Sequence, residues 1–474
     1  MTRYAMALDT AACIGCYACT LACKVENASP SGIWMAPVIE REFGAFPDAR
    51  KAFLPLLCNH CADAPCMAAC PTRAISRRPD GIVLIDQDVC CGTRACVIAC
   101  PYGAIHYYHR QDPLLTPFER AKVARHQAGT AQKCTFCAPR IDRGLQPACV
   151  EACPTGARIF GDLDDPASPV AAALAVREAV PLGTPQPTDP SVRYLPEGVS
   201  KAGGAVSDIA LYFRPQRQWW TVQALQFWLL GAGAGVLVAS RALAPEATLF
   251  GLDLGAALAI LLVAGTCLML TSHLGRPTRF LNALRNWRSS WISRGAIADF
   301  VFLAAAAGLA ITPAGPLRVP LTLVALVTAV IVATYPALSM AALGSVPVWR
   351  GWRLPAEAVA EAAMAGTALI GLFVGWSDAV LHALVGAAAL RLTLALIWWG
   401  STPARLAATW SGIVLLLVWG ESARPSGAVM FAHAAGIAAL AAGLVAKQAN
   451  LDDGRVPSPF GPDGRLGGRP DAKG

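Results

Sequence analysis

Cys90-Cys91-Gly92-Thr93-Arg94-Ala95-Cys96-Val97-Ile98-Ala99-Cys100-Pro101 is the segment from which the organisation of this 474-residue chain can be worked out. Three of its cysteines, Cys90, Cys96 and Cys100, fall on the spacing C-x2-C-x2-C-x3-C-P, whose thiolates hold iron–sulfur clusters. Thr93 stands at the second position of that spacing, and Cys91 lies out of register. Because a hydroxyl is a poor substitute for a thiolate on iron, we expect this copy to build an incomplete cluster.

Three more cysteine runs share the closing C-x3-C step. The first is Cys13, Cys16, Cys19 and Cys23; the second is Cys58, Cys61, Cys66 and Cys70 before Pro71; the fourth is Cys134, Cys137, Cys149 and Cys153 before Pro154. The first run ends in Lys24 instead of proline, and the fourth contains an eleven-residue insertion. A single C-x2-C pair also occurs in zinc sites. Four runs of this form indicate iron–sulfur clusters rather than structural zinc or disulfides.

Composition divides the chain into a soluble part and a membrane part. Sixteen of the 17 cysteines precede residue 154, whereas the sequence from Trp219 onward is dominated by Ala, Leu, Val and Gly. A mean hydropathy of +0.46 with 15% charged residues is too apolar for a wholly soluble chain. The formal charge of +8 is concentrated in arginines near the apolar segments. Such arginines are typical of membrane flanks, so we expect a lipid bilayer and no nucleic acid as partner.

Eight apolar runs have about the length that a bilayer requires, roughly 20 residues each. They are 219–243, 249–271, 295–312, 320–343, 357–376, 379–399, 405–420 and 428–446. With the N-terminal domain in the cytoplasm, eleven Lys or Arg residues flank the spans on that side and three on the other. This bias, together with an N-terminus that lacks an apolar signal segment, predicts a multi-pass protein of the cell inner membrane with its iron–sulfur domain on the cytoplasmic side.

The predicted fold is an α+β tandem ferredoxin-like iron–sulfur domain followed by an all-α bundle of eight transmembrane helices. We place the four-cluster domain at 1–161, a proline-rich connector at 162–217, the membrane anchor at 218–446 and a disordered tail at 447–474. Within the first domain we expect short strands such as 81–86 and a short helix after each Cys-Pro pair. Within the connector, Tyr194-Leu195-Pro196 is expected to dock rather than to hang free.

The loop after the second span carries two further motifs, H-L-G-x-P-x-R at 273–279 and S-x-x-S at 290–293. With the four cysteine runs, these motifs make the chain resemble two proteins of the dimethyl sulfoxide reductase family of molybdoenzymes, the iron–sulfur electron-transfer subunit and the membrane anchor subunit, fused into one. The resemblance implies a separate molybdopterin-containing catalytic subunit as partner, electron exchange with membrane quinone or quinol, and no haem. Where that family usually has a glutamate after the second motif, this chain has Gly295; Asp299, one helical turn on, is the alternative carboxylate.

The resemblance also implies how the runs combine, the first with the fourth and the second with the third. The implied ligand sets are Cys13, Cys16, Cys19 and Cys153; Cys23, Cys134, Cys137 and Cys149; Cys58, Cys61, Cys66 and Cys100; and Cys70, Cys90 and Cys96 with Thr93 or Cys91. The first three sets would hold [4Fe-4S] clusters and the last a [3Fe-4S] or [4Fe-4S] cluster. Whether Thr93 or Cys91 completes the last set stays open.

A quinone site is expected where His273, Arg276 and Arg279 meet the fourth cluster, with Trp287 and Trp291 as apolar walls. His273 has a second interpretation, in which it only caps the second span. The predicted function is therefore a non-catalytic electron-transfer and quinone-reactive anchor subunit. The alternatives are the same role in a cytoplasmic quinone-linked sulfite dehydrogenase, and an ion-translocating ferredoxin–membrane protein. Arg391, inside the sixth span, is expected either to snorkel inward or to line a proton or quinone route.

Overall fold

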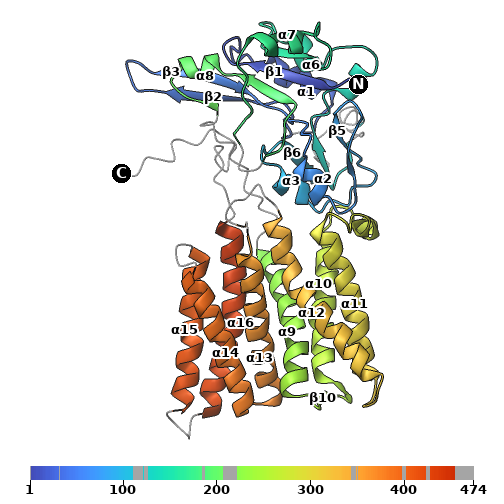
Figure 1. The fold of residues 1–474 in the computed structure, drawn as a ribbon, viewed down its shortest axis with the longest axis vertical. Helices are drawn as coiled ribbons and strands as arrows, with labels where there is room; N and C mark the ends of the chain where they lie inside the picture. The colour runs from blue at the N-terminus through green and yellow to red at the C-terminus, as the bar shows by residue number, and fades with distance from the viewer. Residues whose placement is uncertain are drawn as a thin grey trace. The chain divides into compact units, whose positions relative to one another are not determined.

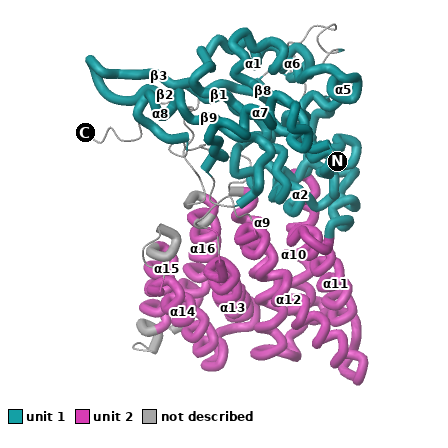
Figure 2. Tube along the Cα trace, turned by 45° about the horizontal axis from the view of Figure 1, so that its top comes forward, with its two compact units in different colours: residues 1–214, 274–286, 457–474 teal, residues 215–273, 287–456 magenta. Residues whose placement is uncertain are grey.

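The computed structural model divides into two compact units (Figure 2). Unit 1 comprises residues 1–214, 274–286 and 457–474, and unit 2 comprises residues 215–273 and 287–456. The structure describes residues 2–30, 32–109, 121, 126–183, 187–206, 221–342, 349, 351–397, 402–422 and 428–453. A short segment that lies between two membrane helices in the sequence, 274–286, therefore belongs to the cysteine-rich unit.

Unit 1 is built around a three-stranded sheet with the order β8-β1-β9, and Figure 2 labels its three strands. β1 (Tyr4–Asp9) runs antiparallel to β8 (Arg158–Asp162) and parallel to β9 (Val192–Leu195). The sheet joins the beginning of the chain to the residues that follow the last cysteine run. Since residues 5–8 of β1 are almost completely buried, this strand is the centre of the fold of unit 1.

Three β-hairpins and several short helices surround this sheet. Their bounds are β2 (Val38–Phe43), β3 (Arg50–Pro55), β4 (Ile75–Arg77), β5 (Val83–Ile85), β6 (Ile105–Tyr108), β7 (Thr130–Lys133), α1 (Ala18–Glu26), α2 (Pro65–Ala69), α3 (Ala95–Ala99), α5 (Ala138–Ile141) and α6 (Ala148–Glu151). Helix α1 packs against α6, and α2 packs against α3. The first cysteine run therefore meets the fourth, and the second meets the third.

The short helices lie before the Cys-Pro pairs, so the prediction that they follow these pairs is wrong. α2 ends directly before Cys70, and α3 ends directly before Cys100. Both cysteines have extended backbones, with ψ of 113° and 111°. The proline that follows disfavours the helical conformation for the residue before it, so each helix stops at its last cysteine. The strand expected at 81–86 is confirmed as β5.

The proline-rich connector is not extended over its described part. It forms the end of β8, then α7 (Pro169–Val176), β9 and α8 (Glu197–Lys201), all within unit 1. Tyr194 is fully buried, and its hydroxyl donates to the carbonyl of Pro55 at 3.1 Å, so this segment docks as expected. Prolines end the short elements here, but they do not prevent the strand between them from pairing. Residues 207–217 of the predicted connector lie outside the described residues.

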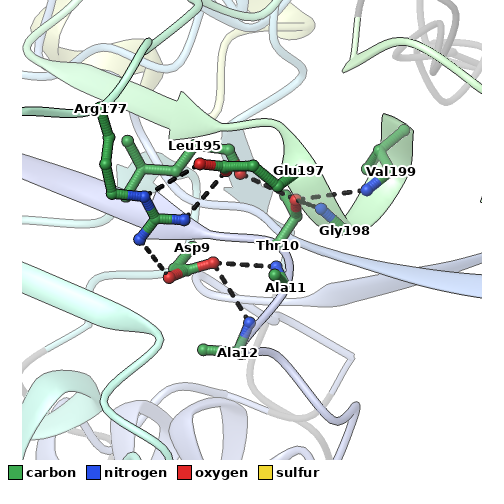
Figure 3. Close-up of polar contacts among 9 residues, drawn as sticks. All are labelled: Asp9, Thr10, Ala11, Ala12, Arg177, Leu195, Glu197, Gly198 and Val199. Atoms are coloured by element: carbon green, nitrogen blue, oxygen red, sulfur yellow. Dashed lines mark hydrogen bonds and ion pairs between the residues drawn. The ribbon is translucent and has the colours of Figure 1, made fainter. Parts of the chain in front are cut away.

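Polar contacts fasten this segment to the start of the chain (Figure 3). Arg177 donates to Asp9 at 2.5 Å and to Glu197 at 3.0 Å. The hydrogen bond from Arg177 to Glu197 lowers the pKa of the Glu197 carboxyl. The Thr10 hydroxyl donates to the carbonyl of Leu195 at 2.8 Å and accepts from the amide of Gly198 at 3.0 Å. These contacts fix β9 and α8 beside β1, close to the first cysteine run.

Unit 2 contains eight long helices in the part of the chain that the structure describes (Figure 1). They are α9 (Thr221–Leu243), α10 (Leu254–Ser272), α11 (Trp291–Ile311), α12 (Arg318–Ala341), α13 (Arg353–Val374), α14 (Asp378–Ile397), α15 (Thr402–Ser422) and α16 (Ala428–Asp453). Seven are long and apolar enough to cross a membrane, and α15 contains a shorter apolar segment, Leu406–Val418. α16 continues into the predicted tail, whose remaining residues, 454–474, lie outside the described part.

Helix α9 packs against α10, α12, α13 and α16 and so holds the bundle together. At its crossing with α13, a Cβ on Gly235 would lie 1.9 Å from the carbonyl oxygen of Ala362, and a Cβ on Gly366 would lie 2.2 Å from the backbone of Gly235. Small residues at such a crossing allow two helix backbones to approach closely.

The second helix begins at Leu254, five residues after the predicted start at 249. Residues before it form a small hairpin of β10 (Thr248–Leu249) and β11 (Leu252–Asp253). Asp253 is the N-cap, and its carboxylate accepts from the amide of Ala256 at 3.0 Å. The same carboxylate forms ion pairs with Arg241 and Arg318. A capping carboxylate satisfies free helix amides, which explains why the helix starts there despite the apolar residues before it.

Candidate iron–sulfur sites and the segment 274–286

The structure gathers the cysteines of unit 1 into four groups, which we name sites I to IV. Site I comprises Cys13, Cys16, Cys19 and Cys153; site II Cys23, Cys134, Cys137 and Cys149; site III Cys58, Cys61, Cys66 and Cys100; and site IV Cys70, Cys90, Cys91 and Cys96 with Thr93. The side chains of sites I, III and IV each line one cavity. The thiols of site II interact electrostatically with one another.

The first and third cysteine runs share a backbone feature that places Thr93. Tyr17, directly after Cys16, has a left-handed backbone with φ of 59° and precedes α1. Arg94, directly after Thr93, has φ of 65° and precedes α3. Thr93 therefore occupies the place in site IV that Cys16 occupies in its own run, and Cys91 lines the same cavity from a different position. The structure keeps both residues available to site IV.

Burial controls the protonation of these thiols. It raises the pKa of Cys23 and of Cys61 to about 12, with neighbouring thiols adding to the effect. Both side chains are consequently neutral thiols at neutral pH when no iron is bound. Since iron binds the thiolate form, cluster assembly at sites II and III must release protons.

Buried cations between the sites fit negatively charged clusters. Arg158 is 2% exposed and lines the cavity of site I. It interacts electrostatically with Cys149 of site II and Cys19 of site I. Lys133, also buried, donates to the carbonyl of Cys134 at 3.0 Å. A buried cation is costly unless an anion accompanies it, and iron–sulfur clusters with their thiolates supply that negative charge.

Arg276 and Arg279 form hydrogen bonds with residues next to site IV. The guanidinium of Arg279 donates to the backbone carbonyls of Gln87 and Cys90 at 2.6 and 3.1 Å and to the Gln127 side chain at 3.1 Å. The backbone amide of Arg276 donates to the carbonyl of Cys91 at 3.1 Å. All of these residues belong to unit 1. Two of these three hydrogen bonds of Arg279 are directed at the backbone at and just before Cys90.

The other predicted quinone residues, His273, Trp287 and Trp291, belong to unit 2. His273 is the C-cap of α10, and its Nδ1 lies 2.7 Å from the carbonyl oxygen of Met269. A carbonyl only accepts, so Nδ1 carries the proton in the neutral ring and Nε2 is left as an acceptor. Trp287 is 53% exposed, whereas Trp291 is the first residue of α11 and stacks under Arg294. His273 thus caps its helix, and its Nε2 can act as a hydrogen-bond acceptor.

Unit 2 also buries ionisable side chains, among them Asp299, Glu361 and Arg391. Asp299 accepts from the Tyr335 hydroxyl at 3.1 Å, and its other oxygen, Oδ1, has no hydrogen-bond partner within the described parts of the chain. Arg391 is 1% exposed and pairs with Glu361 at 3.2 Å. Glu361 in turn pairs with Lys447 at 2.8 Å. The sequence had suggested snorkelling or an open route for Arg391, but the structure shows an ion pair inside the bundle.

Sequence reasoning missed Glu361, Lys447 and Asn286. Glu357 and Glu361 are four residues apart in an apolar segment, which is the spacing that puts two carboxylates on one helix face and was an available signal. Asn286 has no such signal, because the hydrogen bonds of its side chain with Cys70 and Arg73 join residues more than 200 positions apart in the sequence.

The cysteine sites and the small hairpins define an iron–sulfur electron-transfer protein, and comparisons with known proteins agree. Residues 49–163 match the 4Fe-4S dicluster domain. The chain is 38% identical over 224 residues to the arsenate respiratory reductase iron-sulfur subunit ArrB of Shewanella sp. (strain ANA-3), a match covering 41% of this chain and 96% of the relative.

Two further relatives match the same share of the chain. A putative iron-sulfur subunit of the dimethyl sulfoxide reductase of Halobacterium salinarum is 40% identical over 209 residues, covering 41% of this chain and 79% of the relative. A sulfite dehydrogenase subunit of Allochromatium vinosum is 36% identical over 218 residues, covering 41% and 84%. The chain therefore belongs to the family of iron–sulfur subunits of molybdoenzyme complexes, and the similarity covers its N-terminal part. Its helical C-terminal region is a candidate membrane-spanning extension of that subunit.

Proposed function

We propose that this protein passes electrons between a separate molybdopterin-containing catalytic subunit and the quinone pool of the inner membrane. The observation that carries the proposal is that the described part of one chain contains four cysteine sites together with eight long helices, seven of them long and apolar enough to cross a membrane. The relatives are subunits of reductases or dehydrogenases, which supports a catalytic partner that this chain does not itself provide.

Sites I to III would each hold a [4Fe-4S] cluster through four thiolates, and site IV a [3Fe-4S] or [4Fe-4S] cluster. When bound, these clusters supply one-electron transfer, with potentials set by cluster charge, hydrogen bonds to sulfur and solvent exposure. Arg158 and Lys133 would balance the negative charge from within the protein, and the short helices and Cys-Pro turns would hold the thiolates in place.

For the quinone we propose His273 as the polar contact, with Trp287 and Trp291 as apolar neighbours. Quinone reduction takes up two protons as well as two electrons, so its site needs a group that exchanges protons near neutral pH, and imidazole is such a group. The exposed His273, whose Nε2 can accept a hydrogen bond while Nδ1 donates to Met269, supports this role. Arg276 and Arg279 belong to unit 1, and the contacts of Arg279 favour another role.

The test uses the full chain in lipid vesicles, reduced chemically and mixed with a soluble quinone analogue while cluster absorbance is followed. We expect rapid reoxidation in the unaltered protein and its loss in His273→Ala, with cluster content unchanged. His382→Ala is the matched control, because His382 is also an exposed histidine whose Nδ1 contacts the carbonyl four residues earlier, at 2.6 Å from Asp378. If His273→Ala is reoxidised as rapidly as His382→Ala and the unaltered protein, His273 is not the quinone contact. If the unaltered protein is not reoxidised by the quinone analogue, the proposed reaction with quinone is wrong.

The direction of electron flow gives two versions of the proposal. Quinol oxidation would feed reduction of an S- or N-oxide by the partner, and the reverse flow would serve a cytoplasmic sulfite dehydrogenase. The similarity to a sulfite dehydrogenase subunit supports keeping the second version. Purification of the chain with its catalytic partner, followed by assays of quinol-dependent reduction and sulfite-dependent quinone reduction, would separate the two.

A second candidate function is ion translocation, favoured by the buried Asp299 and by the Glu361–Arg391 pair. A carboxylate with an open oxygen inside an apolar bundle is a candidate proton carrier. If the protein translocates ions in this way, vesicles that contain a pH-sensitive dye should show a pH change during quinone turnover. That change should be larger than the proton uptake or release of the quinone reaction alone. Asp299→Asn should then abolish the additional pH change while quinone reoxidation of the clusters continues.

A further inference from the structure

Asn286 connects the end of the segment 274–286 to the second cysteine run. Its side-chain amide donates to the carbonyl of Cys70 at 2.7 Å, and its backbone amide donates to the carbonyl of Pro71 at 3.0 Å. Its side-chain oxygen accepts from Arg73 at 3.2 Å. Asn286 is buried. Both of its donors therefore hold the Cys-Pro turn that presents Cys70 to site IV.

The beginning of the segment holds the third run in the same way. The amide of Arg276 reaches the carbonyl of Cys91, and the Arg279 guanidinium reaches the carbonyls of Gln87 and Cys90. Arg279 also interacts electrostatically with the Cys90 thiol. Hydrogen bonds from a charged donor are stronger than those between neutral groups. The 3₁₀ helix η2 (Pro277–Leu284) lies between Arg276 and Asn286 in the sequence. It therefore sets the distance between the residue that contacts the third run and the residue that contacts the second run.

Close backbone packing shows that the contact is built into the fold of unit 1. A Cβ on Gly275 would lie 2.1 Å from both the carbonyl oxygen of Gly129 and the hydroxyl of Tyr107. A Cβ on Gly92, which follows Cys91, would lie 2.3 Å from the same carbonyl and 2.9 Å from Gly275. Only glycine allows three backbones to approach this closely. The glycine of the H-L-G motif is therefore explained by packing beside site IV.

We propose that the segment 274–286 is a structural part of site IV, and that Arg279 and Asn286 are positioning residues for its cysteines rather than quinone ligands. Asn286 fixes the run that carries Cys70, and Arg279 fixes the run that carries Cys90. Partners that orient metal ligands from outside commonly change metal affinity or activity by roughly 10- to 100-fold when they are removed. The inference rests on the proposed function only in assuming that site IV holds a cluster.

The charge of Arg279 adds a second effect. A reduced cluster carries one more negative charge than the oxidised one, so a nearby guanidinium favours reduction and raises the potential. Arg279→Gln should therefore lower the potential of the site IV cluster. We expect at least a tenfold change in its reduction equilibrium, which corresponds to about 59 mV for a one-electron couple. Arg279→Lys keeps the charge but loses the forked geometry, so its potential should lie between the two.

The experiment is a redox titration of the full chain in membranes, followed by electron paramagnetic resonance, on Arg279→Gln, Arg279→Lys and Asn286→Ala. Arg285→Gln is the matched control, because Arg285 is an exposed cation of the same segment. Asn286→Ala should perturb or eliminate the site IV signal. The signals of the other three sites should not change in any variant, which shows that the protein is folded.

The same samples are tested for exchange with a quinone analogue, so that the two proposals can fail separately. Site IV spectra and potential that are unaltered in both Arg279→Gln and Asn286→Ala would overturn the positioning role. If Arg279→Gln left the potential of site IV unchanged but abolished electron exchange with the quinone analogue, Arg279 would be a quinone ligand. Conversely, a shifted site IV in a protein that never reacts with quinone would support the positioning role and refute the quinone function alone.

Discussion

Neutralising Glu361 should destabilise unit 2 more than neutralising either of its cationic partners. Glu361 contacts Arg391 at 3.2 Å through one oxygen and Lys447 at 2.8 Å through the other. The side chains of Glu361, Arg391 and Lys447 are 5%, 1% and 13% exposed. Glu361→Gln leaves Arg391 as a buried charge whose Nε and Nη1 already have no partner among the described residues. Breaking a buried pair in this way costs about 3–5 kcal/mol.

The two cation variants should cost less. Arg391→Gln leaves Glu361 paired with Lys447, so we expect about half of the former loss, roughly 2 kcal/mol. Lys447→Gln removes the most exposed charge and should cost about 1 kcal/mol. With a shift of about 2–4 °C per kcal/mol for a unit of this size, Glu361→Gln should lower the unfolding temperature by about 6–20 °C.

Thermal unfolding of the full chain in detergent, followed by tryptophan fluorescence, measures the order of these effects. Cluster absorbance monitors unit 1 in the same scan and should not change first. Arg285→Gln, an exposed charge change outside the bundle, provides the baseline. If Lys447→Gln proved the most harmful of the three variants, or Glu361→Gln had no effect, the ion pair would not be a stabilising element of the bundle and our reasoning would be refuted.

Three other predictions concern the clusters and the topology. If Thr93 does not ligate iron, the oxidised protein should show a [3Fe-4S] resonance, and Thr93→Cys should convert that cluster to [4Fe-4S]. If the unaltered protein shows no such resonance, Cys91 completes the cluster, and Cys91→Ser should then produce the resonance. Arg158→Gln should lower the potentials of the clusters at sites I and II and leave site IV unchanged, as redox titration would show, since its charge interacts with Cys19 and Cys149. A C-terminal alkaline phosphatase fusion should be inactive if the cytoplasmic orientation is correct, and activity would instead indicate export of the iron–sulfur domain.

The cysteine sites and the bundle could be predicted because their signals are local. Spacing within each run indicates iron–sulfur ligands, and a bilayer requires apolar runs of about 20 residues. Which runs combine at one site was implied only by the resemblance to a known family, because each site joins cysteines that are far apart in the sequence. The helix next to Cys70 was predicted on the wrong side of the Cys-Pro pair. The cysteine spacing does not show whether the proline begins a helix after it or ends one before it. The strand around Tyr194 was hidden because the surrounding prolines resemble a linker, whereas its pairing with β1 depends on residues far earlier in the chain.

The roles of single residues were harder to predict. Arg279 was recognised as important from its motif, but only the structure shows that its guanidinium contacts backbone carbonyls at site IV. Arg391 was recognised as costly in an apolar segment, and its partner Glu361 lies on a different helix, 30 residues earlier. Sequence identifies which side chains need partners; it does not identify the partner when the two are brought together only by packing.

Unit 1 is discontinuous, and this imposes an order on biosynthesis. Every cysteine of sites I to IV has been synthesised by residue 153, but the segment 274–286 leaves the ribosome only after α9 and α10. Domains that form during synthesis generally fold from the N-terminus onward. Sites I to III can therefore mature early, while the closing of site IV must wait until the first two helices have been made. A ribosome-bound chain that stops before residue 274 would therefore contain all the thiols of sites I to IV and still lack Arg279 and Asn286, the positioning residues that we propose for site IV.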